Sequence, residues 1–133
     1  MDQFASIFGK KDHVVLLDCR SLEHQYYPLN IAGYQLILAD TKVKHSLASS
    51  KYNERRYQCE EGLELLKTRL TGVQSLRDVR SKDVLPYEAI LGEEIALRCK
   101  YVTEEIERVE MCCEALNKAD LNEVGRLMFA THH

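Results

Sequence analysis

The chain has 133 residues, of which 45% are apolar and 29% charged, and its net charge is −3 with histidine neutral. This composition is ordinary for a chain that builds a core, and the length suits one domain. A negative net charge does not recruit polyanions, and no apolar run approaches the ~20 residues needed to cross a bilayer. We therefore expect no nucleic-acid partner and no membrane partner. A cytoplasmic location is the default expectation, because no basic-then-apolar signal opens the sequence.

The first third of the chain is predicted to be rich in β-strands. The continuous apolar run from His13 to Cys19 is typical of a strand buried on both faces. A second extended segment, His24 to Leu29, contains Pro28 and is expected at a sheet edge. Tyr34 to Thr41, with three consecutive apolar residues at its centre, predicts another buried strand. Strands so close in sequence favour antiparallel pairing.

A helix is predicted to begin at Ser49 or Ser50, since either hydroxyl can cap it. Its apolar residues recur at helical spacing: Cys59, Leu63, Leu66 and Leu70. Gly62 inside this helix costs roughly 1 kcal/mol relative to Ala, which we expect the leucine face to tolerate. The segment from Asp78 to Leu91, which contains Pro86, is predicted to be a loop with at most a short helix.

The clearest periodicity predicts a long amphipathic helix with apolar residues alternately four and three positions apart. They are Ile95, Cys99, Val102, Ile106, Val109, Cys113 and Leu116. Asp120 followed by Glu123 is similar to a capping box and opens a last helix. The predicted fold class is α+β, with short antiparallel strands followed by packed helices. We treat the chain as a single segment with a strand-rich portion, 1–45, and a helical portion, 46–133.

The five cysteines are an odd number and lack C-x-x-C spacing. Zinc sites need thiolates or imidazoles two to four residues apart, whereas adjacent Cys112 and Cys113 would point about 100° apart on a helix. Reduced thiols in a core are the favoured interpretation, and we predict no metal site.

Three patches stand in an order typical of one family. The first is Met1 to Phe4 with Ser6 and Phe8 to Lys10, followed by Leu17 to Glu23. The second is Lys42 to Leu47 followed by Ser49 to Glu60, and the third is Thr131 to His133. Together they resemble galactokinases, which belong to the GHMP kinases, the superfamily named for galactokinase, homoserine, mevalonate and phosphomevalonate kinases. The resemblance covers nearly the whole chain and implies part of the two-domain GHMP kinase fold.

The resemblance implies a role for two residues. It places Asp2 beside the C1 hydroxyl of the sugar, where a carboxylate accepts or orients the proton. It places Tyr52, before a double Arg, as a sugar contact. Taken without the resemblance, an Asp near a helix start is more often a cap, and an aromatic residue there more often a packing residue.

Other polar residues have weaker functional interpretations. Arg55 and Arg56 could bind phosphate, but Glu60 and Glu61 stand at helical pairing distance and favour salt-linked surface positions. The surrounding basic cluster has few interleaved aromatic residues and does not predict nucleic-acid binding. Its members are Lys42, Lys44, His45, Lys51, Arg55 and Arg56. The terminal His132 and His133 have no supporting ligand nearby and are not a metal site.

Two motifs of the family do not occur in this sequence: an N-terminal sugar-recognition motif and the Gly/Ser-rich loop that holds the phosphates of ATP. We therefore interpret the chain as an interior piece of a galactokinase. The parent enzyme would phosphorylate galactose with ATP and Mg²⁺, for which this chain provides no binding residues. We expect the isolated chain to be inactive. Its uncovered strands and helix face predict self-association, partial disorder near Met1 or rearrangement of the strand-rich third.

Two other classes of function stay open on the sequence. A galactokinase-like protein without activity could sense a sugar and bind a regulatory partner, and the chain could be a structural or interaction fragment. Within the kinase interpretation, relatives act on N-acetylgalactosamine or arabinose, and galactose is the favoured sugar.

Overall fold

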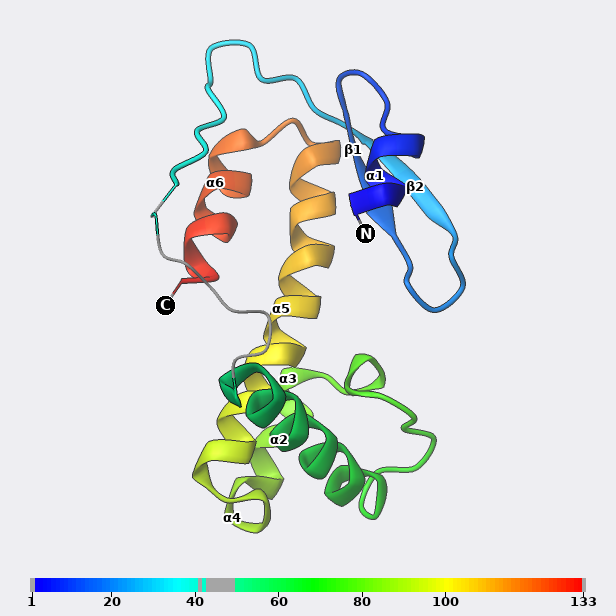
Figure 1. The fold of residues 1–133 in the computed structure, drawn as a ribbon, viewed down its shortest axis with the longest axis vertical. Helices are drawn as coiled ribbons and strands as arrows, with labels where there is room; N and C mark the ends of the chain where they lie inside the picture. The colour runs from blue at the N-terminus through cyan, green and yellow to red at the C-terminus, as the bar shows by residue number, and fades with distance from the viewer. Residues whose placement is uncertain (1, 41, 43–49, 133) are drawn as a thin grey trace. The chain divides into compact units, whose positions relative to one another are not determined.

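A computed structural model describes residues 2–40, 42 and 50–132. The chain forms two compact units, Met1–Leu38 with Arg108–His133, and Ala39–Glu107. We name them the strand unit and the helical unit and describe each by itself (Figure 1). Several predicted features lie outside the described residues: most of the second sequence patch before position 50, Ser49 as a helix start, and the terminal His133.

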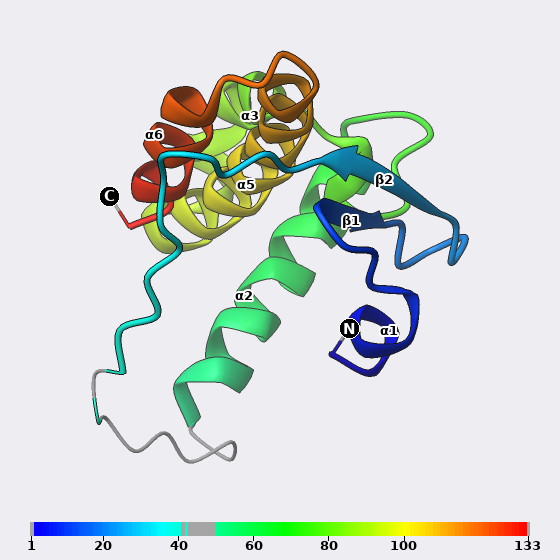
Figure 2. The ribbon, with the colours of Figure 1, turned by 90° about the horizontal axis from the view of Figure 1, so that it is seen from above.

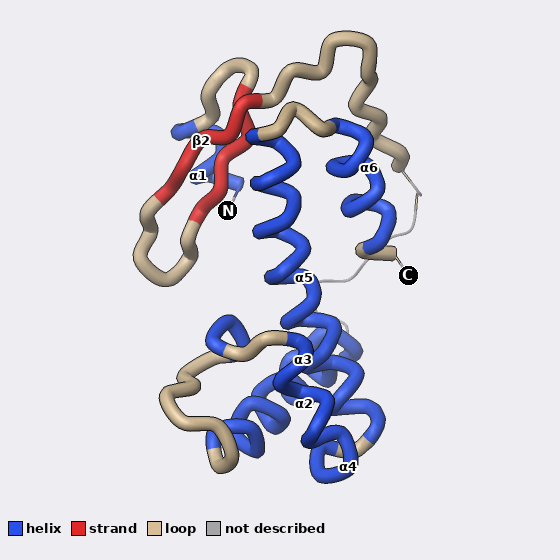
Figure 3. Tube along the Cα trace, turned by 180° about the vertical axis from the view of Figure 1, so that it is seen from behind, coloured by secondary structure: helices blue, strands red, loops and turns tan. Residues whose placement is uncertain are grey.

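The strand unit begins with helix α1, Asp2–Phe8, followed by strands β1, His13–Leu17, and β2, His24–Pro28. The two strands pair antiparallel, with Val15 opposite Tyr26 and Leu17 opposite His24. The antiparallel pairing predicted for this region is thus confirmed for these two strands, which Figure 3 shows in red.

The third predicted strand is wrong for its described part, since residues 34–40 have no regular structure. The side chains of Leu36, Ile37 and Leu38 are 75%, 81% and 96% exposed. An apolar run predicts burial, but a strand also needs a neighbour that accepts and donates its backbone hydrogen bonds. Among the described residues the sheet has only β1 and β2, so this segment lacks that neighbour.

The strand unit closes with the end of helix α5, Glu93–Asn117, and with helix α6, Leu121–Ala130. Both helices were predicted, and the two run side by side in Figures 1 and 3. Leu116 and Leu127 are buried there. Asp120 caps α6, because its Oδ1 accepts the backbone N–H of Glu123 at 3.0 Å. This is one half of the predicted capping box.

The helical unit begins with helix α2, Ser50–Lys67. Four short helical segments follow: η1, Leu76–Asp78; α3, Ser81–Val84; η2, Leu85–Tyr87; and α4, Glu88–Leu91. The segment predicted as a loop with at most one short helix is therefore more helical than expected. Pro86 lies in the first turn of η2, where a missing backbone N–H costs no helical hydrogen bond.

The core of the helical unit forms between α2, the short helices and the first turns of α5. Leu66, Val84 and Cys99 are fully buried at its centre. The buried cluster consists of Leu66, Leu76, Val79, Val84, Leu91, Ala96 and Cys99. The apolar faces predicted for α2 and α5 thus provide core residues, Leu66 and Cys99. Within the part of the chain that the structure describes, no helix is both long and apolar enough to span a membrane.

Candidate functional site

Asp2 lies in the first turn of α1, and its side chain is exposed. Its backbone carbonyl accepts a hydrogen bond from Ser6 Oγ at 2.9 Å, one turn along the helix. Because the carboxylate faces solvent, a ligand that approaches the start of α1 can reach it.

Aromatic side chains connect α1 to β2. The rings of Phe4 and Phe8 stack with centroids 4.4 Å apart, and the imidazole of His24 lies 5.3 Å from Phe4 and 5.2 Å from Phe8. Tyr26 meets His24 edge-on at 5.3 Å, and its hydroxyl donates to the Phe8 carbonyl at 2.8 Å. We name Phe4, Phe8, His24 and Tyr26 the aromatic cluster. Figures 1 and 2 both show α1 beside the hairpin that this cluster holds.

Two further side chains border the aromatic cluster. The ammonium of Lys10 lies 5.4 Å from the centroid of the Tyr26 ring, a cation–π distance. His13 meets Tyr26 edge-on at 6.1 Å, and its Nδ1 is 2.8 Å from the carbonyl of Lys11. Both residues belong to the segment and strand that follow α1, and His13 brings β1 to the edge of the cluster that joins α1 to β2.

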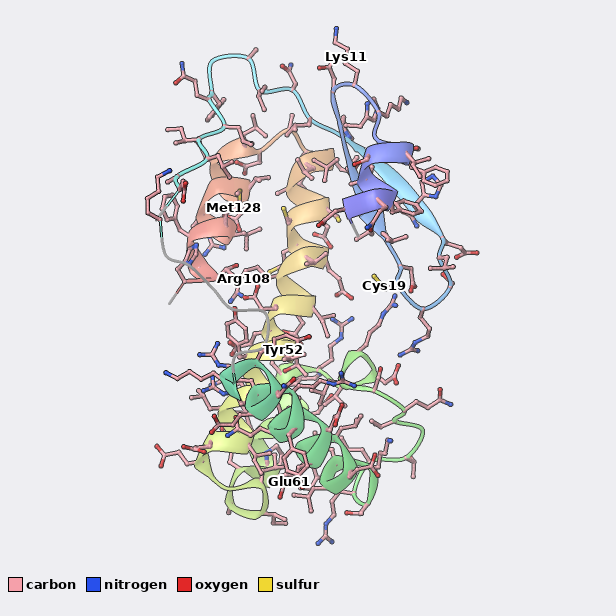
Figure 4. All side chains as sticks on the ribbon, viewed as in Figure 1. Lys11, Cys19, Tyr52, Glu61, Arg108 and Met128 are labelled. Atoms are coloured by element: carbon pink, nitrogen blue, oxygen red, sulfur yellow. The ribbon has the colours of Figure 1, made fainter. Side chains whose placement is uncertain are left out.

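The residues Asp18 to Leu22, part of the first sequence patch, form the turn between β1 and β2. Oδ1 of Asp18 accepts the backbone N–H of Arg20 at 2.8 Å and of Ser21 at 3.2 Å. Leu22 has φ 62° and donates its N–H to the Asp18 carbonyl at 2.8 Å. These contacts close the hairpin, which gives Asp18 a structural role in the turn. Cys19, labelled in Figure 4, is exposed in this turn.

Tyr52 lies in the first turn of α2, with 65% of its surface exposed (Figure 4). Arg55 is exposed on the same helix. Arg56 donates from Nε to Oε1 of Glu60 at 2.8 Å, an exposed pair four residues apart. The salt-linked surface position predicted for Arg56 is confirmed.

All five cysteines are free thiols. Burial raises the pKa of the Cys99 thiol to about 11, and it also raises the pKa of Cys59, Cys112 and Cys113. Thiols with raised pKa values are poor nucleophiles at neutral pH. Across residues 2–40, 42 and 50–132 there is no group of three or more His, Cys, Asp or Glu side chains that could hold a metal ion.

The two predicted site residues belong to different compact units, Asp2 to the strand unit and Tyr52 to the helical unit. The arrangement that sequence reasoning missed is the aromatic cluster. Two signals for it were present: Phe4 and Phe8 are four residues apart on a helix, and His24 and Tyr26 alternate on a strand, so each pair shares a face.

No family model matches this chain. It is similar, however, to curated galactokinases from three bacteria. It is 44% identical over 132 residues to the protein of Thermotoga neapolitana, 40% over 132 residues to that of Chloroflexus aurantiacus, and 38% over 133 residues to that of Limosilactobacillus reuteri. Each match covers 99% of this chain and 34% or 35% of the relative. The chain thus spans about a third of the length of the curated relatives it matches.

A solved galactokinase structure is also similar to this chain in its fold. The galactokinase of Lactococcus lactis, complexed with galactose, matches with a TM-score of 0.86 and 28% sequence identity. The match covers 97% of this chain and 33% of that structure.

Proposed function

We propose that this chain, a homologue of galactokinases along nearly all of its length, is one part of an enzyme that phosphorylates galactose at its C1 hydroxyl with ATP. The matches confirm the resemblance drawn from the sequence patches and the α+β fold class, as part of the GHMP kinase fold. The single observation that carries the proposal is the 44% identity over 132 residues.

In this proposal Asp2 accepts or orients the proton of the C1 hydroxyl as that oxygen attacks the terminal phosphoryl group. Phosphoryl transfer needs the attacking oxygen in line and its proton removed, and a positioned carboxylate supplies this. The exposed side chain at the start of an anchored helix supports the role, because the carboxylate is both accessible and held.

Tyr52 is the proposed sugar contact. A phenol hydroxyl can both donate and accept a hydrogen bond, as a sugar hydroxyl can, and the rigid ring limits the entropy lost on binding. Its exposure, 65%, leaves the hydroxyl available.

ATP supplies the phosphoryl group, and Mg²⁺ neutralises charge on its phosphates. We assign both to the part of the relatives outside the matched third, because the Gly/Ser-rich phosphate loop typical of the family does not occur in this sequence. The proposed location is the cytoplasm, where ATP is available. Since positioning and charge stabilisation need those other segments, we expect this chain alone to transfer no phosphoryl group.

The test uses a chimera in which this chain replaces the matching 132 residues of the Thermotoga neapolitana galactokinase. Asp2→Asn is expected to lower kcat by roughly 10²- to 10⁴-fold, the usual contribution of a general base. Tyr52→Phe is expected to raise the KM for galactose by roughly 2- to 10-fold, the value of one hydrogen bond. Coupled assay of ADP release measures both.

Each variant has a matched control. Asp12→Asn removes an exposed carboxylate of the same unit, and Tyr57→Phe removes an exposed hydroxyl of the same helix. Both controls should keep the kinetics of the unsubstituted chimera. Full activity of the Asp2→Asn chimera would remove Asp2 from the mechanism.

A further inference from the structure

We propose that His24 is a positioning residue, which holds α1 on the hairpin through the aromatic cluster and so fixes the carboxylate of Asp2. The inference rests on the proposed function of Asp2 and adds a residue that the family resemblance does not assign. It starts from the length of α1, which has seven residues. Helices this short are unstable in water, so contacts with the rest of the protein must hold α1 in place.

The contacts come from one face of the helix and one face of the hairpin. Phe4 and Phe8, four residues apart, point to the same side of α1, and His24 and Tyr26 point to the same side of β2. The His24 imidazole touches both phenylalanine rings and Tyr26, with centroids 5.2 to 5.3 Å apart. It is half-buried. His24 is therefore the member of the cluster that contacts the three other rings.

The geometry restrains α1 in two ways. The contacts of the His24 ring with Phe4 and Phe8, with centroids 5.3 and 5.2 Å apart, resist rotation of the helix about its axis, and the edge-on contact with Tyr26 within β2 holds the imidazole itself. The 2.8 Å hydrogen bond from the Tyr26 hydroxyl to the Phe8 carbonyl fixes the far end of the helix. Asp2 is two residues from Phe4, so a rotation that breaks the ring contacts also displaces its carboxylate.

The kinetic test uses the Thermotoga chimera described above. His24→Ala is expected to lower kcat by roughly 10- to 100-fold, as for a catalytic group displaced by about 1 Å, with the KM for ATP unchanged. His24→Phe keeps an aromatic ring at the contact and should restore most of kcat. Tyr26→Phe removes only the hydroxyl and should lower kcat less than His24→Ala does.

Two neighbours on the other face of β2 provide controls. Gln25→Ala and Tyr27→Phe change side chains outside the aromatic cluster, and both should keep the unsubstituted kcat. If His24→Ala leaves kcat unchanged while Asp2→Asn abolishes activity, the positioning role is overturned and the proposed function stands. If Asp2→Asn keeps full activity, the proposed function has failed instead.

A second readout uses the same chimera and does not depend on activity. Amide hydrogen exchange measured by mass spectrometry should show faster exchange in α1 for His24→Ala than for His24→Phe, with the Gln25→Ala variant like the unsubstituted chimera. Equal exchange in α1 for all of these variants would overturn the anchoring of α1 by His24.

Discussion

Gly62 shows how a residue that looks unfavourable in the sequence is required by packing. A Cβ atom at this position would lie 2.3 Å from Cys99 Sγ and 2.8 Å from Ile95 Cγ2, both on α5. Real Cβ atoms do not approach heavy atoms so closely, so α2 can meet α5 here only without a side chain. The sequence predicted a cost of Gly in the helix, but not the close contact that offsets it.

Gly62→Ala is therefore expected to destabilise the chain by roughly 1 to 3 kcal/mol, because overpacking outweighs the gain in helix propensity. Gly125→Ala in α6 is the matched control: apart from its chain neighbours and the helix's own backbone, nothing lies within 4 Å of the added Cβ, so this variant should raise the free energy of unfolding by up to about 1 kcal/mol. Urea unfolding followed by circular dichroism measures both.

Adding Cys99→Ala to the Gly62→Ala variant should recover part of the lost stability. Equal effects of Gly62→Ala and Gly125→Ala on stability would contradict the close packing of α2 on α5.

The negatively charged side chain of Glu107 stabilises the helical unit through hydrogen bonds from Ser81. Its carboxylate accepts the backbone N–H of Ser81 at 2.8 Å and the Ser81 hydroxyl at 2.9 Å, which fixes the start of α3 on α5. The hydrogen bond from the Ser81 backbone, chiefly, holds the pKa of this carboxyl below its ordinary value of 4.5. A lowered folded-state pKa stabilises the fold above the ordinary value and loses that contribution as the pH falls through the lowered one.

Glu107→Gln is expected to lower the free energy of unfolding by about 1.5 kcal/mol at pH 7, which is the lower end of the contribution of hydrogen bonds to a charged group. The difference from the unsubstituted chain should shrink as the pH falls below 4.5, because the native carboxyl then becomes protonated. Thermal unfolding of both proteins at pH 7 and at acid pH measures this difference in stability. Glu60→Gln, which removes only an exposed pair with Arg56, should change little at either pH. A difference that grows on acidification would contradict the assignment.

At the scale of elements, periodicity predicted the helices well. The four-and-three spacing along α5 and the Asp120 cap of α6 are local signals, and both helices occur as predicted. The sequence underestimates the helical content between Asp78 and Leu91, because Pro86 suggests a break in a helix although it occupies a first turn. The aromatic cluster was missed because it joins segments that only the folded hairpin brings together.

The strand predicted around Leu36 to Leu38 is wrong because a strand needs a partner elsewhere in the chain. The sequence of the segment itself does not show whether that partner is present. Its exposure supports the prediction that the chain self-associates. Replacing all three residues by Ser should lower the association seen by sedimentation velocity and leave the helix content unchanged. A control with Met128→Ser and Phe129→Ser, also exposed on α6, distinguishes this segment from general apolar surface.

A chain that is monomeric at every concentration would contradict that prediction.

For the whole molecule, we propose that the chain works as about one third of a larger galactokinase-like enzyme, because it spans 35% of the length of a curated relative. Its similarity to galactokinases supports this proposal, in which the ATP and Mg²⁺ sites lie in the other two thirds. Asp2 and Tyr52, which belong to separate compact units, are proposed to meet one sugar only in that larger protein.

Galactose-dependent release of ADP, measured side by side for the 133-residue chain and for the Thermotoga chimera, tests this proposal. We expect no release by the chain alone and clear release by the chimera, which Asp2→Asn abolishes. Galactose-dependent ADP release by the chain alone, or a folded chimera without activity, would contradict the proposal that the chain is one part of a larger kinase.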